Sequence, residues 1–474
     1  MSTSTQQQAK STRGGIGAIR SVAQPLSVSG PSAGTAILPA TVVAVTGTAG
    51  APSFLLGLLA GGLVVYVLSS LARHFSSDGS LYFYAGIIGT TKLALLTGWI
   101  YLLTYLGFAG SVLSNEANFV NVALEYAKLP SISWPLVALV IWAICLYVVW
   151  RGAEFSTGFQ VVVECLGIAA LLLVGVTVLA TGGDHGIHLG EAFSLSGVHG
   201  GKLFLGMAIA LGSFGGFESG ASLSEETHSA RRTVPASMWI SLLISGALYV
   251  FACVFITLGF PSLEALAASP APLFALGERH FGTWAAFVMT SVVVIAGMST
   301  VSAATTGAVR TLNAMWRDGL FGRRLTSTGV PPMVIGICGA AILGLSIGFA
   351  RYPAYLAFEY VAAAAALLLT TSYLAVVMLS VYWFARLRST IGVVIAVLAS
   401  AVLGYSLWSS VYPAPEAPFS YLPYIDLALV AVGVCYLAFA GKAVRRVDSS
   451  THWQAARTER DRLIEAARPR KMLR

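Results

Sequence analysis

Charged residues are scarce in this chain, because Asp, Glu, Lys and Arg make up only 10% of its 474 residues. Soluble domains carry about 25% charged residues, so the composition excludes an ordinary soluble protein. Hydrophobic residues account for 56%. Uncharged runs approach the roughly 20 residues that a membrane-spanning helix needs. The runs are 54–72, 93–114, 135–150 and 166–181. We therefore expect an all-α integral membrane protein.

Several chemical signatures are also missing. The five cysteines all fall inside apolar segments, and no outer loop holds a pair, so a disulfide framework is not expected. No CxxC, HExxH or GxxxxGK[S/T] motif occurs, which argues against a zinc centre and an ATP-driven pump. His185 and His188 in one outer loop give only a weak metal signal. We predict no metal, no cofactor and no enzymatic activity.

Hydropathy predicts about twelve transmembrane helices. They are 19–46, 53–73, 92–114, 134–150, 156–181, 202–226, 234–259, 283–306, 333–350, 353–384, 390–411 and 422–440. We expect a disordered N-terminus over 1–18, a ten-helix core over 19–384, helices 11 and 12 within 385–440, and a basic tail over 441–474. From 451 on, the tail could form a basic amphipathic helix on the membrane surface or remain solvated.

The net charge of +8 could suggest nucleic acid, but its distribution argues against that partner. With both termini placed in the cytosol, 24 of the 28 Lys and Arg residues fall on the inner side. The outer loops would hold only Lys128, Lys202, Arg279 and Arg351. This bias follows the positive-inside rule, so we expect a multi-pass protein of the cytoplasmic membrane with both termini cytosolic.

Two glycine-rich stretches interrupt otherwise apolar segments. The first is Ser-Gly-Pro-Ser-Ala-Gly-Thr at 29–35, and the second is Gly-Ser-Phe-Gly-Gly-Phe-Glu-Ser-Gly at 212–220. Non-helical backbone inside a membrane must lie against protein or a watery cavity. The breaks fall in spans 1 and 6, and an odd number of spans per repeat turns the second copy upside down. This pattern is typical of a five-plus-five inverted-repeat transporter, although each break alone could be a packing kink.

Four motifs resemble the amino acid–polyamine–organocation (APC) superfamily, and they occur in that family's order between about 25 and 320. The first is the broken first helix at 29–35, and the second is Asp-Gly-Ser-Leu-Tyr-Phe-Tyr at 78–84 followed by Gly-Trp at 98–99. The third combines Phe-Glu-Ser at 217–219, Glu-Glu at 225–226 and Arg-Arg-Thr-Val-Pro at 231–235. The fourth is Arg-Thr-Leu-Asn-Ala-Met-Trp-Arg-Asp-Gly at 310–319. The resemblance implies discontinuous helices 1 and 6. Span 5 carries Glu164 where some proton-coupled members have a lysine. The resemblance therefore supports the family's fold for this chain better than it supports the family's coupling ion.

The breaks predict a site for an amino acid. A helix N-terminus attracts a carboxylate, which places the N–H groups of Ser32, Ala33 and Gly34 at the substrate. Carbonyl groups freed near Ser29 would accept bonds from the substrate ammonium. The second break frees further carbonyls at Ser213, Phe214 and Gly215.

Acidic residues in apolar segments are functional candidates, because a charge in hydrocarbon costs about 2.5–3.5 kcal/mol. Glu164 and Glu218 are candidates for proton coupling. Glu164 could instead bond a neighbouring helix, and Glu218 could instead brace the second break. Glu359 and Asp426 receive no role. Sodium remains possible as the coupling ion, because span 8 offers hydroxyl groups. These are Ser299, Thr300, Ser302, Thr305 and Thr306.

The pocket walls are expected to include Tyr101 or Tyr105 on span 3, Phe214 or Phe217 at the second break, and Tyr360 on span 10. The predicted function is secondary active import of an amino acid or related amine, by proton-coupled symport with alternating access. Two alternatives stay open: exchange without an ion, and a nutrient sensor that does not transport. A major-facilitator carrier is disfavoured, because the segment 74–78 after span 2 is not the basic Gly-Asp-Arg loop of that class.

Overall fold

The computed structural model describes residues 15–183, 189–195, 200–269, 271–321, 329–412 and 417–467, and it contains helices but no strand in these ranges. The helices are α2 (Ala18–Ser29), α3 (Pro31–Gly34), α4 (Leu38–Thr46), η1 (Gly47–Ala49), α5 (Gly50–His74), α6 (Ser80–Ile88), α7 (Thr91–Tyr126), α8 (Trp134–Trp150), α9 (Ala153–Thr181), α10 (Leu189–Ala192), α11 (Gly200–Ser213), η2 (Phe217–Leu223), α12 (Ala230–Gly259), α13 (Leu263–Ala267), α14 (Pro272–Phe281), α15 (Thr283–Arg317), α16 (Pro332–Ile347), α17 (Ala354–Arg386), α18 (Thr390–Ser409), η3 (Phe419–Tyr421), α19 (Leu422–Phe439), α20 (Gly441–Asp448) and α21 (Thr451–Ala466).

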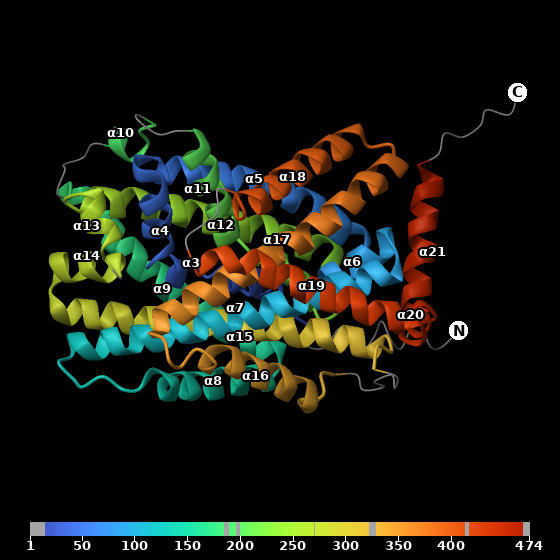
Figure 1. Ribbon diagram of the computed structural model, residues 1–474, viewed down its shortest axis with the longest axis horizontal. Coiled ribbons are helices and arrows are strands. Elements are labelled where there is room, and N and C mark those ends of the chain that lie inside the picture. The colour runs from blue at the N-terminus through green and yellow to red at the C-terminus, as the bar shows by residue number, and fades with distance from the viewer. Residues whose placement is uncertain are drawn as a thin grey trace, which may run out of the picture.

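Most of these helices run along the long axis of the molecule (Figure 1). Nine helical segments in the described residues are long and apolar enough to cross a membrane, and two shorter apolar helices, α8 and α16, accompany them. Predicted span 1 corresponds to α2, α3 and α4, and predicted span 6 to α11 and η2. The all-α membrane fold is therefore confirmed.

The packing of the helices repeats when each is replaced by the helix five spans later. Helix α2 packs on α12, and its counterpart α11 packs on α5. Helix α7 packs on α17 and α16, and its counterpart α15 packs on α9 and α8. The same set of neighbours in both halves, with five spans in each, is the arrangement of an inverted repeat.

Both ends of the described chain lie at one end of the bundle, which we call the terminal face, while α13 and α14 lie at the opposite end (Figure 1). Residues 1–14 lie outside the described residues. The rest of the expected disordered terminus, 15–18, is ordered, because Ile16 is buried and its N–H donates to the Glu226 carbonyl at 2.9 Å. Helix α7 continues to Tyr126, well beyond the predicted end of span 3 at residue 114.

The C-terminal tail is helical in the described residues. It forms α20 and α21, and α21 stands across the terminal face (Figure 1). Trp453 of α21 is fully buried against the protein. An apolar anchor of this size docks the helix onto the bundle.

Candidate functional site

The first break separates α2 from α3 at Gly30. Gly30 has φ 48° and ψ 50°, in the left-handed region that residues with side chains rarely adopt. Its N–H donates to the Leu26 carbonyl at 3.0 Å and ends α2, and Pro31 begins α3. A Cβ atom at position 30 would lie 2.8 Å from Oγ1 of Thr300 on α15. Glycine is therefore required here by the backbone and by the close approach of α15.

The second break lies between α11 and η2, and it touches the first. Gly216 has φ 104°, and a Cβ atom there would lie 2.2 Å from Cγ1 of Val28. The Ser29 hydroxyl donates to the Phe214 carbonyl at 3.3 Å, and the Tyr249 hydroxyl donates to the Ser29 carbonyl at 3.1 Å. The two predicted breaks thus form one continuous site in the middle of the bundle.

Glu164 of α9 reaches the first break. Its Oε1 accepts hydrogen bonds from the N–H of Ser32 at 3.2 Å and from the Ser32 hydroxyl at 2.8 Å. The Ser299 hydroxyl of α15 donates to its Oε2 at 3.4 Å. The Glu164 side chain is buried. A carboxylate of the protein therefore holds the amide that we had assigned to the carboxylate of the substrate.

One turn of α15, residues 296–300, forms the wall opposite the first break. A Cβ atom on Gly167 of α9 would meet Ala296 at 2.9 Å and Ser32 at 2.5 Å, so α3, α9 and α15 are in close contact. The Thr300 hydroxyl is buried and has no hydrogen-bond partner among the described residues. Deeper in α15, the Thr305 and Thr306 hydroxyls donate to carbonyls of their own helix at 2.7 and 2.9 Å. Of the hydroxyl-bearing residues predicted on span 8, Ser299 and Thr300 are therefore the ones that contact the first break.

Glu116 of α7 is a buried acidic residue near the first break that the sequence analysis did not single out. It is fully buried, and neither carboxylate oxygen has a hydrogen-bond partner in the described part of the chain. It lies against Gly297 of α15, where a Cβ atom would be 2.1 Å from its carboxylate. Our predicted span 3 ended at 114, and this boundary placed Glu116 in a loop; the apolar segment continuing beyond it was the available signal.

Glu218 of η2 is held by three tyrosines. The hydroxyls of Tyr105 and Tyr101 on α7 donate to its Oε1 at 2.7 and 3.1 Å, and the hydroxyl of Tyr373 on α17 donates to Oε2. The ring of Tyr373 stacks on Phe217 with centroids 5.3 Å apart. Three donors around one carboxylate suit its ionised form. This cage ties the second break to α7 and α17.

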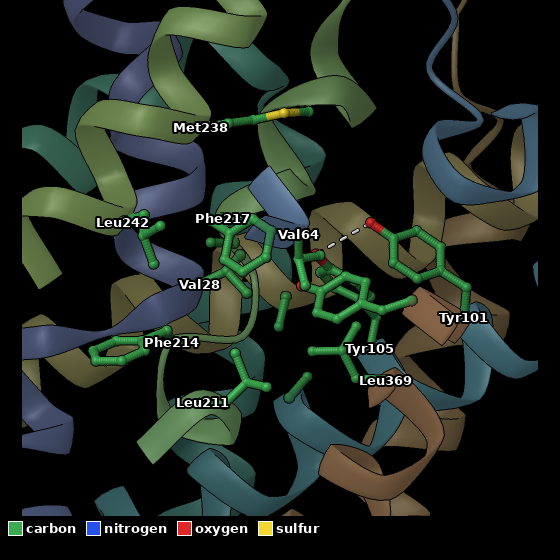
Figure 2. Close-up of a cluster of buried hydrophobic side chains, with 14 of the residues drawn as sticks. Val28, Val64, Tyr101, Tyr105, Leu211, Phe214, Phe217, Met238, Leu242 and Leu369 are labelled. Atoms are coloured by element: carbon green, nitrogen blue, oxygen red, sulfur yellow. Dashed lines mark hydrogen bonds between the residues drawn. The ribbon is translucent and has the colours of Figure 1, made fainter. Parts of the chain in front are cut away.

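Aromatic rings close the other side of the breaks. Phe214 contacts Phe54 of α5 and Tyr249 of α12 edge to face, with centroid distances of 6.1 and 5.8 Å. Phe54 and Tyr249 are stacked at 5.5 Å. Figure 2 shows Phe214 on one side of the cluster and Tyr101 and Tyr105 on the other. All of these side chains are fully buried, so the site is closed in this conformation.

The structure brings most of the predicted residues together. Ser29, Ser32, Phe214 and both candidate tyrosines lie at the breaks, whereas the Gly34 N–H donates to the Gly30 carbonyl at 2.7 Å and is not free. Ala33 is buried in α3, the Ser213 hydroxyl donates to the Ile209 carbonyl at 3.1 Å, and the Gly215 N–H donates to the Gly212 carbonyl at 3.0 Å.

Tyr360, the aromatic residue expected from span 10, does not lie at the breaks. It packs against Phe349, Tyr352 and Phe419 near the start of α17. The tyrosine of α17 that reaches the second break is Tyr373, thirteen residues further along the helix, which is about 20 Å at 1.5 Å per residue. The hydropathy pattern of an all-apolar helix does not indicate which of its turns faces the break.

Metal ligands do not gather in the part of the chain that the structure describes, where no group of three or more His, Cys, Asp or Glu side chains is found. His185 and His188, the weak metal signal in the sequence, lie outside the described residues.

Several known proteins are similar to this chain. The low-affinity putrescine importer PlaP of Escherichia coli is 28% identical over 303 residues, which cover 59% of this chain and 62% of PlaP. The vacuolar cationic amino acid transporter 2 of Arabidopsis thaliana is 30% identical over 336 residues, covering 65% of this chain and 52% of that protein. The L-methionine/branched-chain amino acid exporter YjeH of E. coli is 24% identical over 227 residues, covering 48% and 52%.

The chain thus spans between half and two thirds of the length of these relatives. A family model described as amino acid permease matches residues 24–441, nearly the whole bundle and both breaks. This match confirms the resemblance to the APC superfamily that the four motifs indicated. The chain is a multi-pass membrane protein and belongs to the amino acid permease family.

Proposed function

We propose that this chain is a secondary transporter that imports an amino acid or a related amine together with a proton. The names of its relatives support the substrate class, since they include a putrescine importer and a cationic amino acid transporter. The observation that carries the proposal is the bond between Glu164 and the backbone of the first break. It places a titratable group on the amide that a substrate carboxylate would use.

In the closed conformation, the protein's own groups fill the positions of the substrate. Glu164 accepts from the Ser32 N–H in place of a substrate carboxylate. The Tyr249 hydroxyl donates to the Ser29 carbonyl in place of a substrate ammonium. The Ser29 hydroxyl is shared between the Pro25 carbonyl at 3.0 Å and the Phe214 carbonyl at 3.3 Å, and the latter carbonyl is a second acceptor for that ammonium. An arriving amino acid would take the Ser32 N–H from Glu164 with its own carboxylate, and its ammonium would replace the neutral hydroxyl bonds with charge-assisted ones, which are about twice as strong.

Coupling then follows from competition for one amide. An ionised Glu164 holds the Ser32 N–H and repels a second carboxylate nearby. A protonated Glu164 carries no charge and binds the amide weakly, so the substrate carboxylate can enter. Proton and substrate are therefore taken up together, and their joint binding shifts the balance between outward-facing and inward-facing states.

Glu116 favours a substrate with a second positive group. A buried carboxylate without a donor is costly, and one partner that supplies positive charge removes that cost. Glu116 contacts Gly297, one turn from Thr300 at the first break. The positive group of a cationic amino acid would supply that charge to Glu116. We therefore place cationic amino acids first among the candidate substrates, because they carry both the carboxylate that competes with Glu164 and a second positive group.

For the orientation we propose that the terminal face is cytosolic. The support is the charge distribution, because 24 of the 28 Lys and Arg residues fall on that side of the predicted spans. The membrane would be the cytoplasmic membrane.

Uptake into proteoliposomes tests the proposal. Labelled amino acids and polyamines are offered under an inward proton gradient, an inward sodium gradient, or neither. We expect accumulation driven by the proton gradient, lost in Glu164→Gln and retained in Glu359→Gln, a matched control on α17. Uptake that needs only preloaded substrate would instead identify an exchanger. Tight binding without uptake would identify a sensor, and either result would overturn the proposal.

A further inference from the structure

Helix α21 is fixed to the terminal face by one buried aromatic side chain. Trp453 is fully buried and contacts Tyr82 and Phe83 of α6 edge to face, each with a centroid distance of 5.6 Å. A Cβ atom at Gly86 of α6 would lie 1.8 Å from the Trp453 ring, so only glycine leaves room for it. Helix α6 thus carries a slot that fits this tryptophan.

The same tryptophan is bonded to the end of α15. Its Nε1 donates to Oδ2 of Asp318 at 2.6 Å, and the Tyr82 hydroxyl donates to the same oxygen at 2.8 Å. The Ser450 hydroxyl donates to Oδ1 at 3.4 Å. Asp318 is the residue that ends α15, so one carboxylate joins α6, α15 and the C-terminal segment.

A second set of contacts holds α21 along α6 and α7. The Arg457 guanidinium donates to Asp448 at 2.6 Å and to the Thr91 hydroxyl at 2.8 Å, and Thr91 donates to Asp448 at 2.6 Å. Further along α21, Arg460 donates to the Ile87 carbonyl, the second-last residue of α6, at 3.0 Å. The attachment therefore involves both ends of α6.

Beneath this attachment lies the ion-pair network that closes the terminal face. Arg317, next to Asp318, forms a two-pronged pair with Glu225 at 2.7 and 2.8 Å. Arg310, two turns earlier in α15, pairs with Glu226 at 2.6 Å. The Glu225 N–H donates to Asp78 at 2.8 Å, just before α6. These bonds tie the segment after the second break to α15 and to the start of α6, so they must separate before this face can open.

We propose that α20 and α21 form a clamp that holds the terminal face closed and must leave its slot before that face opens. The family match ends at residue 441, so the clamp lies beyond the part that this chain shares with the family model. The clamp acts by fixing α6 against the end of α15. The partners of Glu225 are Arg317 at the end of α15 and Asp78, two residues before α6. The effect of the clamp on transport rests on the proposed function, whereas its effect on the closed conformation does not.

Hydrogen exchange on the full-length protein tests the clamp without any substrate. We compare Trp453→Ala with Thr458→Ala, an exposed residue of the same helix. The expected result is at least tenfold faster amide exchange in α6 and around 310–318 for Trp453→Ala, with α8 and α16 unchanged. Faster exchange over the whole bundle would mean general destabilisation, and unchanged exchange in α6 would mean passive docking. Either outcome would overturn the proposal.

A second variant guards against misfolding of the first. The chain is ended after residue 441, and a synthetic peptide of residues 442–467 is added in trans. We expect faster α6 exchange in the shortened protein, reversed by the peptide but not by the same peptide carrying Trp453→Ala. Failure of the intact peptide to restore slow exchange would contradict the clamp.

Transport in proteoliposomes gives a separate measurement. The shortened protein should transport about three- to tenfold faster than the full-length protein. If the wild type does not transport at all, the proposed function is contradicted, but the exchange result still stands.

Discussion

The two breaks are each completed by a carboxylate, but the carboxylates are held in different ways. At the first break Glu164 comes from another helix and accepts bonds from Ser32 and, at longer range, from Ser299. At the second break Glu218 belongs to the break itself and is held by tyrosines from α7 and α17. In the proposed mechanism one proton releases the first arrangement, whereas the second ties two further helices to the break. The first break is thus suited to exchanging ligands and the second to holding a conformation.

The largest effect is expected from removing the charge at the second break. Glu218→Gln replaces a carboxylate that accepts three hydroxyl bonds, and bonds to a charged group contribute about 1.5–3 kcal/mol each. We expect the free energy of unfolding to fall by about 3 kcal/mol, and Tyr373→Phe to cost about half as much. Thermal unfolding in detergent measures both, with Tyr355→Phe, an exposed tyrosine of α17, as the control. Equal stability of Glu218→Gln and wild type would show that the cage is not a structural tie.

A methyl group at Gly34 tests the contact between the first break and α12. Its Cβ would lie 2.1 Å from the Tyr249 hydroxyl, and overpacking of this kind costs about 1–3 kcal/mol. We expect Gly34→Ala to lower the unfolding temperature and the double variant with Tyr249→Phe to recover part of the loss. Gly336→Ala in α16, where a Cβ meets nothing within 4 Å, should be neutral or stabilising. A double variant no more stable than Gly34→Ala would contradict this explanation.

A smaller effect is expected at Ser32, where the hydroxyl and the N–H share one acceptor. Ser32→Ala removes the 2.8 Å hydroxyl bond to Glu164 but keeps the backbone bond at 3.2 Å. The cost should be about 1–2 kcal/mol, measured by chemical unfolding, and well below that of Glu218→Gln. Ser400→Ala in α18, whose hydroxyl bonds only to its own helix, is the control. A loss at Ser32 larger than at Glu218 would reverse the proposed division of roles.

Asp78 offers a carboxylate outside the membrane-spanning helices for comparison with the two in the breaks. Burial and the nearby Glu225 charge raise the pKa of Asp78 from 3.8 to about 7. The folded protein therefore retains a proton that the unfolded chain releases, and this site loses stability as the pH rises from about 4 to 7. The unfolding temperature of Asp78→Asn minus that of wild type should grow over this range and then level off. A constant difference would contradict the raised pKa.

Much of the fold could be predicted from the sequence. Long apolar runs determine which segments can cross the membrane as helices. Gly30 and Gly216 mark the breaks, because few other residues tolerate a positive φ there. The helix boundaries were less predictable. Helix α7 continues for about three turns beyond the predicted end of span 3, through Glu116, where the sequence becomes less hydrophobic. The sequence also pointed to Tyr105 as a residue near the breaks, and the structure places its hydroxyl on Glu218 of the second break.

What the sequence by itself determined is therefore the class of protein, the two breaks and the residues that lie in them. Tertiary structure alone decided which distant side chains reach those breaks. Tyr373 rather than Tyr360 meets Glu218, and Glu164 meets Ser32, because the rotation of each helix is set by packing with its neighbours. The docking of Trp453 against Asp318 also has no local signal, since the slot is made by α6 and the end of α15. In an apolar helix the pattern is nearly the same on every face, so only the packed bundle fixes which face looks inward.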